Sequence, residues 1–346
     1  MIAMVRVAFI GAGARAVSHI AAVGSIEGAE VVAICDLSEE IGRAAQDKAN
    51  ARLRAGVEPI DAKFFTDSNV MTGSVDFEAV YLCLPPFVHG EIDHKIIDMG
   101  KAIFIEKPLA VEMGPALEIA AHIKQKGTIN AVGHQMRNSP VVERAADLLQ
   151  GQQIGMATAI RLSGLPGTPW WRVQERSGGM LIEQHVHAVD LMRVLAGEIE
   201  TVYAVGNTLL SSDVPNLNIF DVNAVTARLA NGAPGIIGNS CAAPAGAAIF
   251  PSHHVQVVTA DFVADVNPRQ TVIHRVDAEP EVWTSEHDGT FVMNERFISA
   301  VRDGDQSLIS CNYDDALGSF AVTVAAQKSA ESGEVITVSD LLAPSA

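Results

Sequence analysis

The chain has 346 residues, of which 48% are hydrophobic and 19% are charged. This composition is typical of a folded globular protein, and the length exceeds what one hydrophobic core usually supports, so we expect two domains. The formal net charge of −17 argues against a nucleic-acid partner, because phosphate binding needs clustered Lys and Arg.

The sequence indicates neither a membrane partner nor a metal site. The longest apolar stretch, residues 233–250, is interrupted by two prolines and an Asn-Ser pair, whereas a spanning helix needs ~18 apolar residues. The N-terminus lacks the basic leader and apolar core of a signal peptide. The cysteines form no C-x-x-C pair, which favours reduced thiols in the cytoplasm over a zinc site or disulfides. They are Cys35, Cys83, Cys241 and Cys311.

The first 132 residues alternate short apolar runs with longer amphipathic segments. The apolar runs are rich in Val, Ile and Ala, as buried parallel strands are. They are residues 5–10, 29–35, 78–84, 102–106 and 129–133. Helical periodicity follows in residues 38–54, 89–100 and 113–127. This pattern predicts an α/β Rossmann domain, a doubly wound parallel sheet covered by helices on both faces.

The pattern changes near residue 133, where we place the start of a second domain, residues 133–346. Strands in series predict an α+β domain with a large, open-faced and mostly antiparallel sheet. The expected strands are residues 156–164, 199–206, 222–230, 254–266 and 270–276. The expected helices are residues 140–150, 179–196, 291–304 and 313–333, with a loop at 164–178.

A glycine motif follows the first predicted strand directly. In "VAFIGAGARA", Gly11 permits a tight turn, Gly13 lets the backbone approach a pyrophosphate, and Ala16 lets the following helix pack on the sheet. The start of that helix offers free N–H groups to an anion. The motif therefore predicts a dinucleotide-binding site.

The end of the second predicted strand indicates which dinucleotide binds. Asp36 lies 20 residues after Ala16, where a carboxylate accepts hydrogen bonds from the ribose hydroxyls of NAD. Glu39 and Glu40 would repel the 2′-phosphate of NADP, although Arg43 would attract it. NAD is therefore expected over NADP. The alternative is a glycine turn followed by an Asp that only caps a helix.

Three further segments resemble one family of enzymes. With the glycine motif, "CLPPFVHGEI", "FIEKPLA" and "GGMLIEQHVHAVDLMRVLAG" resemble the Gfo/Idh/MocA family, which comprises glucose-fructose oxidoreductase, inositol dehydrogenase and many sugar dehydrogenases. The resemblance extends through "SAESGEVITV" near the C-terminus. It implies an NAD(P)-dependent oxidoreductase whose second domain binds substrate and forms homodimers or homotetramers.

The E-K-P element is the most specific part of the resemblance. It implies that Lys107 lies beside the nicotinamide and the reacting hydroxyl, with a cis bond before Pro108. An ammonium group at the end of a strand would stabilise a developing alkoxide. The alternative is a surface lysine before a turn proline.

The glycine motif and the resemblance together give the expected cofactor-binding residues. They are Gly11, Gly13, Ala14, Arg15, Ala16, Asp36, Leu84, Pro85, His89, Glu106, Lys107 and Gln135. His89 matches a P-x-x-x-H segment of the family, but a structural role at a helix start is an equal alternative.

Residues 178–190, "GGMLIEQHVHAVD", hold a carboxylate and two imidazoles whose roles depend on local structure. On a strand, Glu183, His185 and His187 would share one face and resemble a metal site. The spacing of the apolar residues instead predicts a helix over 179–196, with Glu183 and His187 one turn apart. We therefore expect no metal here.

A carboxylate one turn from an imidazole suits acid–base catalysis, in which His187 takes a hydroxyl proton and Glu183 assists. The family pattern D-x-G-x-H-x-x-D is matched by His187 and Asp190, while Glu183 replaces Asp and His185 replaces Gly. His185 would narrow the substrate pocket, contact a hydroxyl or only pack. A structural His187 is the alternative to a base, and Asp190 is expected to anchor the helix.

The expected substrate-binding residues come from the second domain and from the E-K-P element. They are Lys107, Arg137, Trp171, Arg172, His185 and His187. The Trp170-Trp171 pair could present a flat apolar face to a sugar, or could pack the loop. Arg137 could equally be a generic crossover arginine.

The sequence thus predicts an NAD-dependent dehydrogenase that oxidises a secondary hydroxyl of a sugar, sugar acid or cyclitol. His187 is the expected general base, and Lys107 is expected to stabilise the oxyanion. The alternatives are a reductase of a keto-sugar or imine on the same fold, and a dinucleotide sensor without activity.

Overall fold

The computed structural model describes residues 3–244 and 250–343. The apolar stretch 233–250, which the sequence did not favour as a membrane segment, therefore lies partly outside the described residues. Within these ranges, no helix has the length and hydropathy needed to cross a bilayer.

The chain forms two compact units, and each unit is made of three separate segments of the sequence. The first unit comprises the residues up to Lys107, Glu118–Gln135 and Gly289–Asp314. The second comprises Pro108–Leu117, Met136–Asp288 and the residues from Asp315 on. The division into residues 1–132 and 133–346 remains a prediction.

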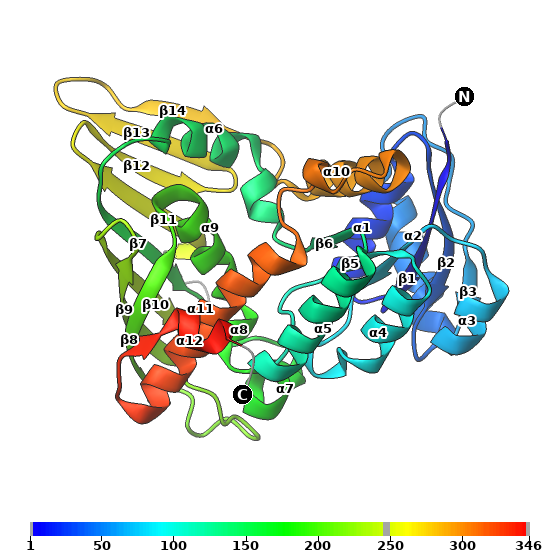
Figure 1. Ribbon diagram of the computed structural model, residues 1–346, viewed down its shortest axis with the longest axis horizontal. Helices are drawn as coiled ribbons and strands as arrows, with labels where there is room; N and C mark the ends of the chain where they lie inside the picture. Colours follow the sequence, from blue (N-terminus) through cyan, green and yellow to red (C-terminus); the bar gives the residue numbers. More distant parts are fainter. Residues whose placement is uncertain (1–2, 245–249, 344–346) are drawn as a thin grey trace. The chain divides into compact units, whose positions relative to one another are not determined.

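The first unit is built on a six-stranded parallel sheet in the order β3-β2-β1-β4-β5-β6, which confirms the predicted Rossmann domain (Figure 1). The strands are β1 (Val5–Ile10), β2 (Ala29–Cys35), β3 (Lys63–Phe65), β4 (Ala79–Leu82), β5 (Ala102–Ile105) and β6 (Asn130–Val132). The helices within this unit are α1 (Ala14–Gly24), α2 (Glu39–Asn50), α3 (Ser68–Ser74), η1 (Pro86–Val88), α4 (Glu91–Asp98), α10 (Thr290–Asp303) and η4 (Gln306–Leu308).

Aromatic rings fill the core of the first unit. Tyr81 on β4 stacks between Phe9 on β1 and Phe104 on β5, with ring centroids 4.7 and 4.4 Å away. Phe297 of α10 meets Tyr81 and Phe104 edge-on, at 5.4 and 5.5 Å. α10 lies against α1 (Figure 1), so a helix from late in the chain completes this core.

The second unit is built on a nine-stranded sheet in the order β14-β13-β12-β11-β7-β10-β9-β8-β15 (Figure 1). All neighbours pair antiparallel except β7 and β10, which confirms the predicted mostly antiparallel sheet. The strands are β7 (Ile154–Leu162), β8 (Ile199–Asn207), β9 (Val222–Leu229), β10 (Pro234–Ser240), β11 (Phe250–Thr259), β12 (Phe262–Asn267), β13 (Gln270–Arg275), β14 (Glu281–Thr284) and β15 (Ile336–Thr337).

The helices within the second unit are α6 (Pro140–Leu149), η3 (Pro169–Arg172), α7 (Gln174–Ser177), α8 (Met180–Glu183), α9 (Val186–Ala196) and α12 (Val338–Leu342). Three elements cross between the units along the chain, namely α5 (Met113–Lys126), η2 (Gln135–Asn138) and α11 (Tyr313–Ser332).

Two predicted elements are wrong. The helix over 179–196 is two helices, α8 and α9, because the chain makes a wider turn at Gln184 and His185, whose N–H groups both donate to the Met180 carbonyl. The strand over 254–266 is two antiparallel strands, β11 and β12, joined by a tight turn. The loop at 164–178 also contains the short η3 and α7.

Candidate active site

The glycine turn after β1 has the form that a dinucleotide requires. Gly11 has φ +89°, and a Cβ there would lie 2.3 Å from the Cys83 carbonyl oxygen, so the fold itself demands glycine. Around Gly13, the described residues leave open space within 4 Å of a built Cβ. The packing of the protein therefore does not itself require glycine at position 13. The lack of a side chain there fits close approach of a pyrophosphate.

The helix that follows this turn is arranged for an anion. Gly13 is the N-cap of α1, no acidic residue lies in the first turn, and Ala16 is fully buried against the sheet. Ala14 and Arg15 form the first turn. No carboxylate of the helix's own first turn therefore competes with an anion for its free N–H groups and for the positive end of its dipole.

Asp36 follows β2 and holds the glycine turn from the side. Its Oδ2 accepts a hydrogen bond of 2.8 Å from the Ala12 N–H. The N-cap of α2 is Ser38, so the alternative in which Asp36 only caps that helix is wrong. Asp36 lies at the carboxyl edge of the sheet, after the strand next to β1. The strand order reverses between β1 and β4, which is where ligands bind in open α/β sheets.

Glu106, at the end of β5, is a buried ionic centre. Its Oε1 lies 3.1 Å from Nε of Arg15 and 2.7 Å from Nε2 of His19, and its Oε2 accepts from the Lys107 N–H at 3.1 Å. Burial opposes the charge, but Arg15, His19 and Lys107 outweigh it and lower the pKa of Glu106 to about 2. The carboxylate joins α1 to the E-K-P segment.

Lys107 is half-buried and directly follows this centre. Its backbone is fixed by the Glu106 carboxylate at the carboxyl edge of the sheet, the edge that also carries the glycine turn. An ammonium group held there can stabilise a negative charge that develops on a bound oxygen.

The segment after β4 brings three more expected residues to the same edge. Leu84 lies beside the glycine turn, since a Cβ on Gly11 would be 3.3 Å from its Cδ2. Pro85 precedes η1. The buried His89 side chain places Nδ1 3.0 Å from the Asp93 carboxylate, while Nε2 has no hydrogen-bond partner among the described residues. Asp93 thereby orients the ring.

Gln135 follows β6 and is buried, and its Oε1 lacks a hydrogen-bond partner within the described chain. A buried, unsatisfied amide oxygen is uncommon in native proteins and often marks a ligand site. The first unit thus gathers the expected cofactor residues along the carboxyl ends of β1, β2, β4, β5 and β6.

In the second unit, the break between α8 and α9 sets the two imidazoles. His185 is the N-cap of α9, and His187 lies in its first turn. Both rings face His253 of β11, with centroids 5.8 and 5.4 Å away. Glu183 ends α8 and accepts from the Gln184 amide, so it does not lie one regular turn from His187 as predicted.

The environment of His185 disfavours the protonated form of its ring. Burial, together with the charge of Arg161, lowers the pKa of His185 to about 3, although the Ala159 backbone acts in the opposite direction. The ring is therefore neutral across the physiological range. The three roles predicted for His185, which are narrowing the substrate pocket, contacting a hydroxyl and packing, are all compatible with a neutral ring.

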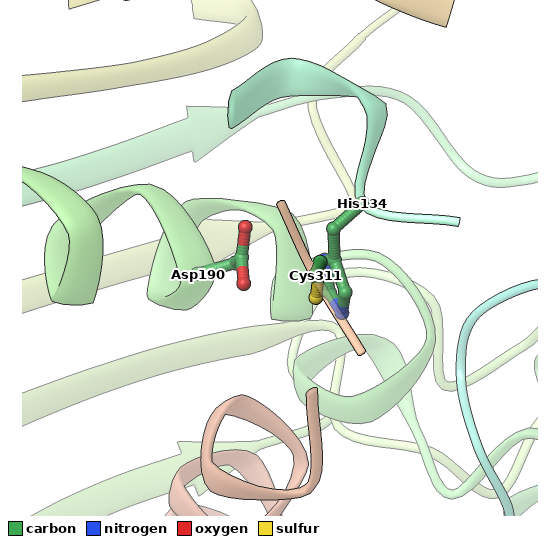
Figure 2. Close-up of side chains that lie close together, drawn as sticks. All are labelled: His134, Asp190 and Cys311. Carbon is green, nitrogen blue, oxygen red and sulfur yellow. The ribbon is translucent and has the colours of Figure 1, made fainter. Parts of the chain in front are cut away.

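Arg137 and Asp190 form an ion pair in the second unit. Nε of Arg137 donates to Oδ2 of Asp190 at 3.0 Å, Ser319 Oγ donates to Oδ1 at 2.9 Å, and the other arm of Arg137 reaches Asp315. Asp190 thus ties α9 (Figure 2) to α11. Substrate contact by Arg137 remains a prediction.

Figure 2 also shows His134 and Cys311 of the first unit close together. Their ligand atoms lie within 4.8 Å of each other. Two such groups are fewer than the four ligands of a structural zinc site.

The tryptophan segment is held by its arginine. Arg172 donates to the Pro166 carbonyl through Nε and a terminal nitrogen, at 3.0 and 2.8 Å. Trp170 and Trp171 pack edge-to-face, 5.7 Å apart, and Trp171 Nε1 has no hydrogen-bond partner in the described ranges. Arg172 therefore shapes this loop, and its substrate contact stays a prediction.

Sequence reasoning missed His19 and a set of polar residues on the second sheet. His19 is fully buried, and its Nδ1 lies 3.1 Å from Asn294 Oδ1. Arg161 and Asn239 sit on buried strand faces. The sequence did hold a sign of the position of Arg161. In "MATAIRLSG", alternation along a strand places Arg161 on the same face as Ala157 and Ala159.

The fold and the glycine turn together define a dinucleotide-binding oxidoreductase with a lysine at the edge of its Rossmann sheet. Residues 5–134 match the model of the oxidoreductase family with an NAD-binding Rossmann fold, and residues 142–261 match the GFO/IDH/MocA C-terminal domain. The chain belongs to the Gfo/Idh/MocA family, which confirms the resemblance.

Several curated relatives are distant in sequence but span nearly the full chain. One is the uncharacterized oxidoreductase YrbE of Bacillus subtilis, 24% identical and covering 95% of each chain. Another is the scyllo-inositol 2-dehydrogenase (NAD(+)) of the same organism, 25% identical over 95% of each. The inositol 2-dehydrogenase of Rhizobium meliloti is 25% identical, over 96% of this chain and 99% of the relative.

Solved structures show the same fold. GenD2 from gentamicin A biosynthesis, in complex with NAD, has a TM-score of 0.81 at 21% identity and covers 97% of each chain. Levoglucosan dehydrogenase, in complex with NADH and levoglucosan, has a TM-score of 0.83 at 17% identity, over 96% of this chain and 99% of that one.

Substitutions at the two glycines should separate folding from cofactor binding. Gly11→Ala should fail to fold or lose several kcal/mol, since its Cβ meets a carbonyl at φ +89°. Gly13→Ala should keep its stability within about 1 kcal/mol and bind NADH at least about 10-fold more weakly. Urea denaturation and NADH fluorescence titration measure the two effects. Unchanged NADH affinity in Gly13→Ala would contradict this site.

Glu106 should contribute stability that depends on pH. Its pKa falls from the ordinary 4.5 to about 2 on folding, so its contribution is present above 4.5 and is lost as pH falls toward 2. The difference is roughly 3 kcal/mol. Glu106→Gln should therefore be less stable than wild type near neutral pH, with the gap closing below about pH 4.5. Urea midpoints across this range test it, with Glu118→Gln, at an exposed position of α5, as the control. A gap independent of pH would contradict the assignment.

Proposed function

We propose that the protein oxidises a secondary hydroxyl of a sugar, sugar acid or cyclitol with NAD. The observation that carries the proposal is Lys107, held by a buried carboxylate beside a glycine turn built for a dinucleotide. NAD, when bound, would supply the hydride acceptor. Gly11, Gly13, Ala14, Arg15, Ala16 and Asp36 would hold its ribose and phosphates, and Leu84, Pro85, His89, Glu106, Lys107 and Gln135 would surround its reactive end.

The chain supplies the proton chemistry. A neutral His187 accepts the hydroxyl proton through a ring nitrogen, and the Lys107 ammonium stabilises the oxygen as it becomes negative. Glu183 is assigned the assisting carboxylate on the family pattern. Trp171, Arg172, His185 and Arg137 are assigned to substrate binding on the same basis.

The reductase alternative uses the same residues in reverse, with Lys107 and His187 returning the proton to the carbonyl oxygen. Turnover measured in both directions at neutral pH distinguishes oxidation from reduction, and absence of turnover in either direction would favour the dinucleotide sensor.

The exposed outer face of the second sheet supports a proposed homodimer or homotetramer, and sedimentation velocity tests this oligomeric state. It carries Tyr203, Val205, Ile236 and Val258.

Removing either proposed catalytic group should stop turnover without loss of the cofactor. Lys107→Met and His187→Ala should each lower kcat roughly 100- to 10,000-fold, because one proton acceptor or one oxyanion-stabilising charge is lost. NADH affinity should change little in His187→Ala. NADH absorbance with a panel of sugars, sugar acids and inositols measures turnover.

Matched controls for these variants are Lys63→Met on β3 and His274→Ala on β13, both at exposed positions. Both should retain wild-type turnover. Wild-type kcat in His187→Ala would show that the base lies elsewhere.

Asp36 should set the preference for NAD. A carboxylate accepts from two ribose hydroxyls and repels a 2′-phosphate, so Asp36→Ser should raise kcat/KM with NADP relative to NAD at least about 10-fold. Initial rates with both cofactors on one substrate measure this ratio. An unchanged ratio would assign the discrimination to other residues.

A further inference from the structure

A row of polar side chains crosses three neighbouring strands on the buried face of the nine-stranded sheet. We name it the polar row: Asn223 on β9, Asn239 on β10 and Arg161 on β7. Strand register places Asn239 opposite both Asn223 and Arg161. Since faces alternate with period two, all three share the face of the buried Val225, Ile237 and Ala159.

The asparagines of the polar row are buried without being satisfied. Asn239 is 3% exposed, and neither its amide oxygen nor its amide nitrogen has a hydrogen-bond partner among the described residues. Asn223 is 7% exposed, and its Oδ1 also lacks one there. Native proteins rarely leave such groups unpaired, so an external partner is expected.

Arg161 is a mostly buried cation without an ion pair among the described residues. Its hydrogen bond within the described chain is to Ser163 Oγ, at 2.6 Å, and no carboxylate there lies within salt-bridge distance. Burial lowers its pKa, with Glu183 the carboxylate whose charge acts most strongly against this. A desolvated guanidinium without an anion is costly, and its planar fork matches a carboxylate.

The polar row lies next to the proposed base. The charge of Arg161 acts on His185, and His185 and His187 both face His253 on β11. α9, which carries His187, packs on β7, the strand of Arg161. A group bound by the polar row would therefore be part of the molecule whose hydroxyl His187 addresses.

We propose that Arg161 and Asn239 bind a carboxylate of the substrate, which makes the substrate a sugar acid rather than a neutral sugar or cyclitol. The inference rests on the proposed function and narrows it. One guanidinium with an amide N–H donor matches a single negative charge. A phosphate would bring nearly two charges close to Glu183 with one cation to balance them.

The test compares ligands that differ only in charge. D-glucuronate, D-galacturonate and D-gluconate are titrated by calorimetry into the NADH-loaded protein, each beside its neutral amide, with D-glucose 6-phosphate as the phosphate probe. At least one acid should bind about 10- to 100-fold more tightly than its amide, the range for a charge-assisted hydrogen bond. Its turnover with NAD should show the same preference in kcat/KM.

Variants assign that preference to the polar row. Arg161→Met should bring the acid-to-amide ratio close to one, and Asn239→Asp should do so too by placing a carboxylate beside Arg161. The control Arg228→Met removes a cation from an exposed position of β9 and should keep the ratio. Because both ligands are measured on the same variant, a general loss of stability does not move the ratio.

Several outcomes would overturn the inference. It is overturned if amides or neutral sugars bind as tightly as the acids, if the phosphate binds more tightly than they do, or if no acid binds. It is also overturned if Arg161→Met lowers the affinities for acid and amide equally. Oxidation of neutral substrates with no preference for acids would leave the proposed dehydrogenase intact. Preferential binding of acids without turnover would instead contradict the proposed function and still support the carboxylate site.

Discussion

The buried carboxylate of Glu106 is the interaction on which the first unit depends. It contacts Arg15 and His19 of α1 and the backbone of Lys107, which follows β5, and His19 in turn contacts Asn294 of α10. One charge thus fixes the helix that begins at the glycine turn relative to the lysine proposed for catalysis. A buried charge is tolerated only when its partners are complete, so loss of any one partner strains the others.

The second unit shows how a small irregularity positions chemistry. The wide turn at Gln184 and His185 separates α8 from α9, which makes His185 the cap of a new helix and puts His187 in its first turn. A continuous helix would have kept Glu183 one turn from His187. The break instead turns both imidazoles toward β11, next to a sheet face whose inward positions include Arg161 and two asparagines.

Much of this was predictable from the sequence, for identifiable reasons. Continuous apolar runs predicted β1, β2, β4, β5 and β6 because strands buried on both faces have few polar positions. The short β3, "KFF", has no such run. The helix break was hidden because the apolar spacing of Leu181, Val189 and Met192 persists through it. The ion pairs of Glu106 and Arg137 join residues far apart in sequence, which periodicity does not report.

The polar row could not be predicted from the sequence for the same reason, because its residues are far apart in sequence. Asn239 lies in a stretch whose hydropathy raised the question of a membrane segment, and only the strand register brings it beside Arg161. Single polar residues within apolar strands carry little weight in a pattern, yet they decide what a buried sheet face can bind.

The position of α10 has a consequence for how the protein is made. Phe297 closes the aromatic stack of Phe9, Tyr81 and Phe104, yet it is synthesised nearly two hundred residues after the last of them. During translation the nascent Rossmann sheet therefore emerges before α10 can cover its core, and β7 to β14 of the second sheet are made in between. Completion of the first unit's core thus depends on a helix in the last sixth or so of the chain rather than on its first third alone.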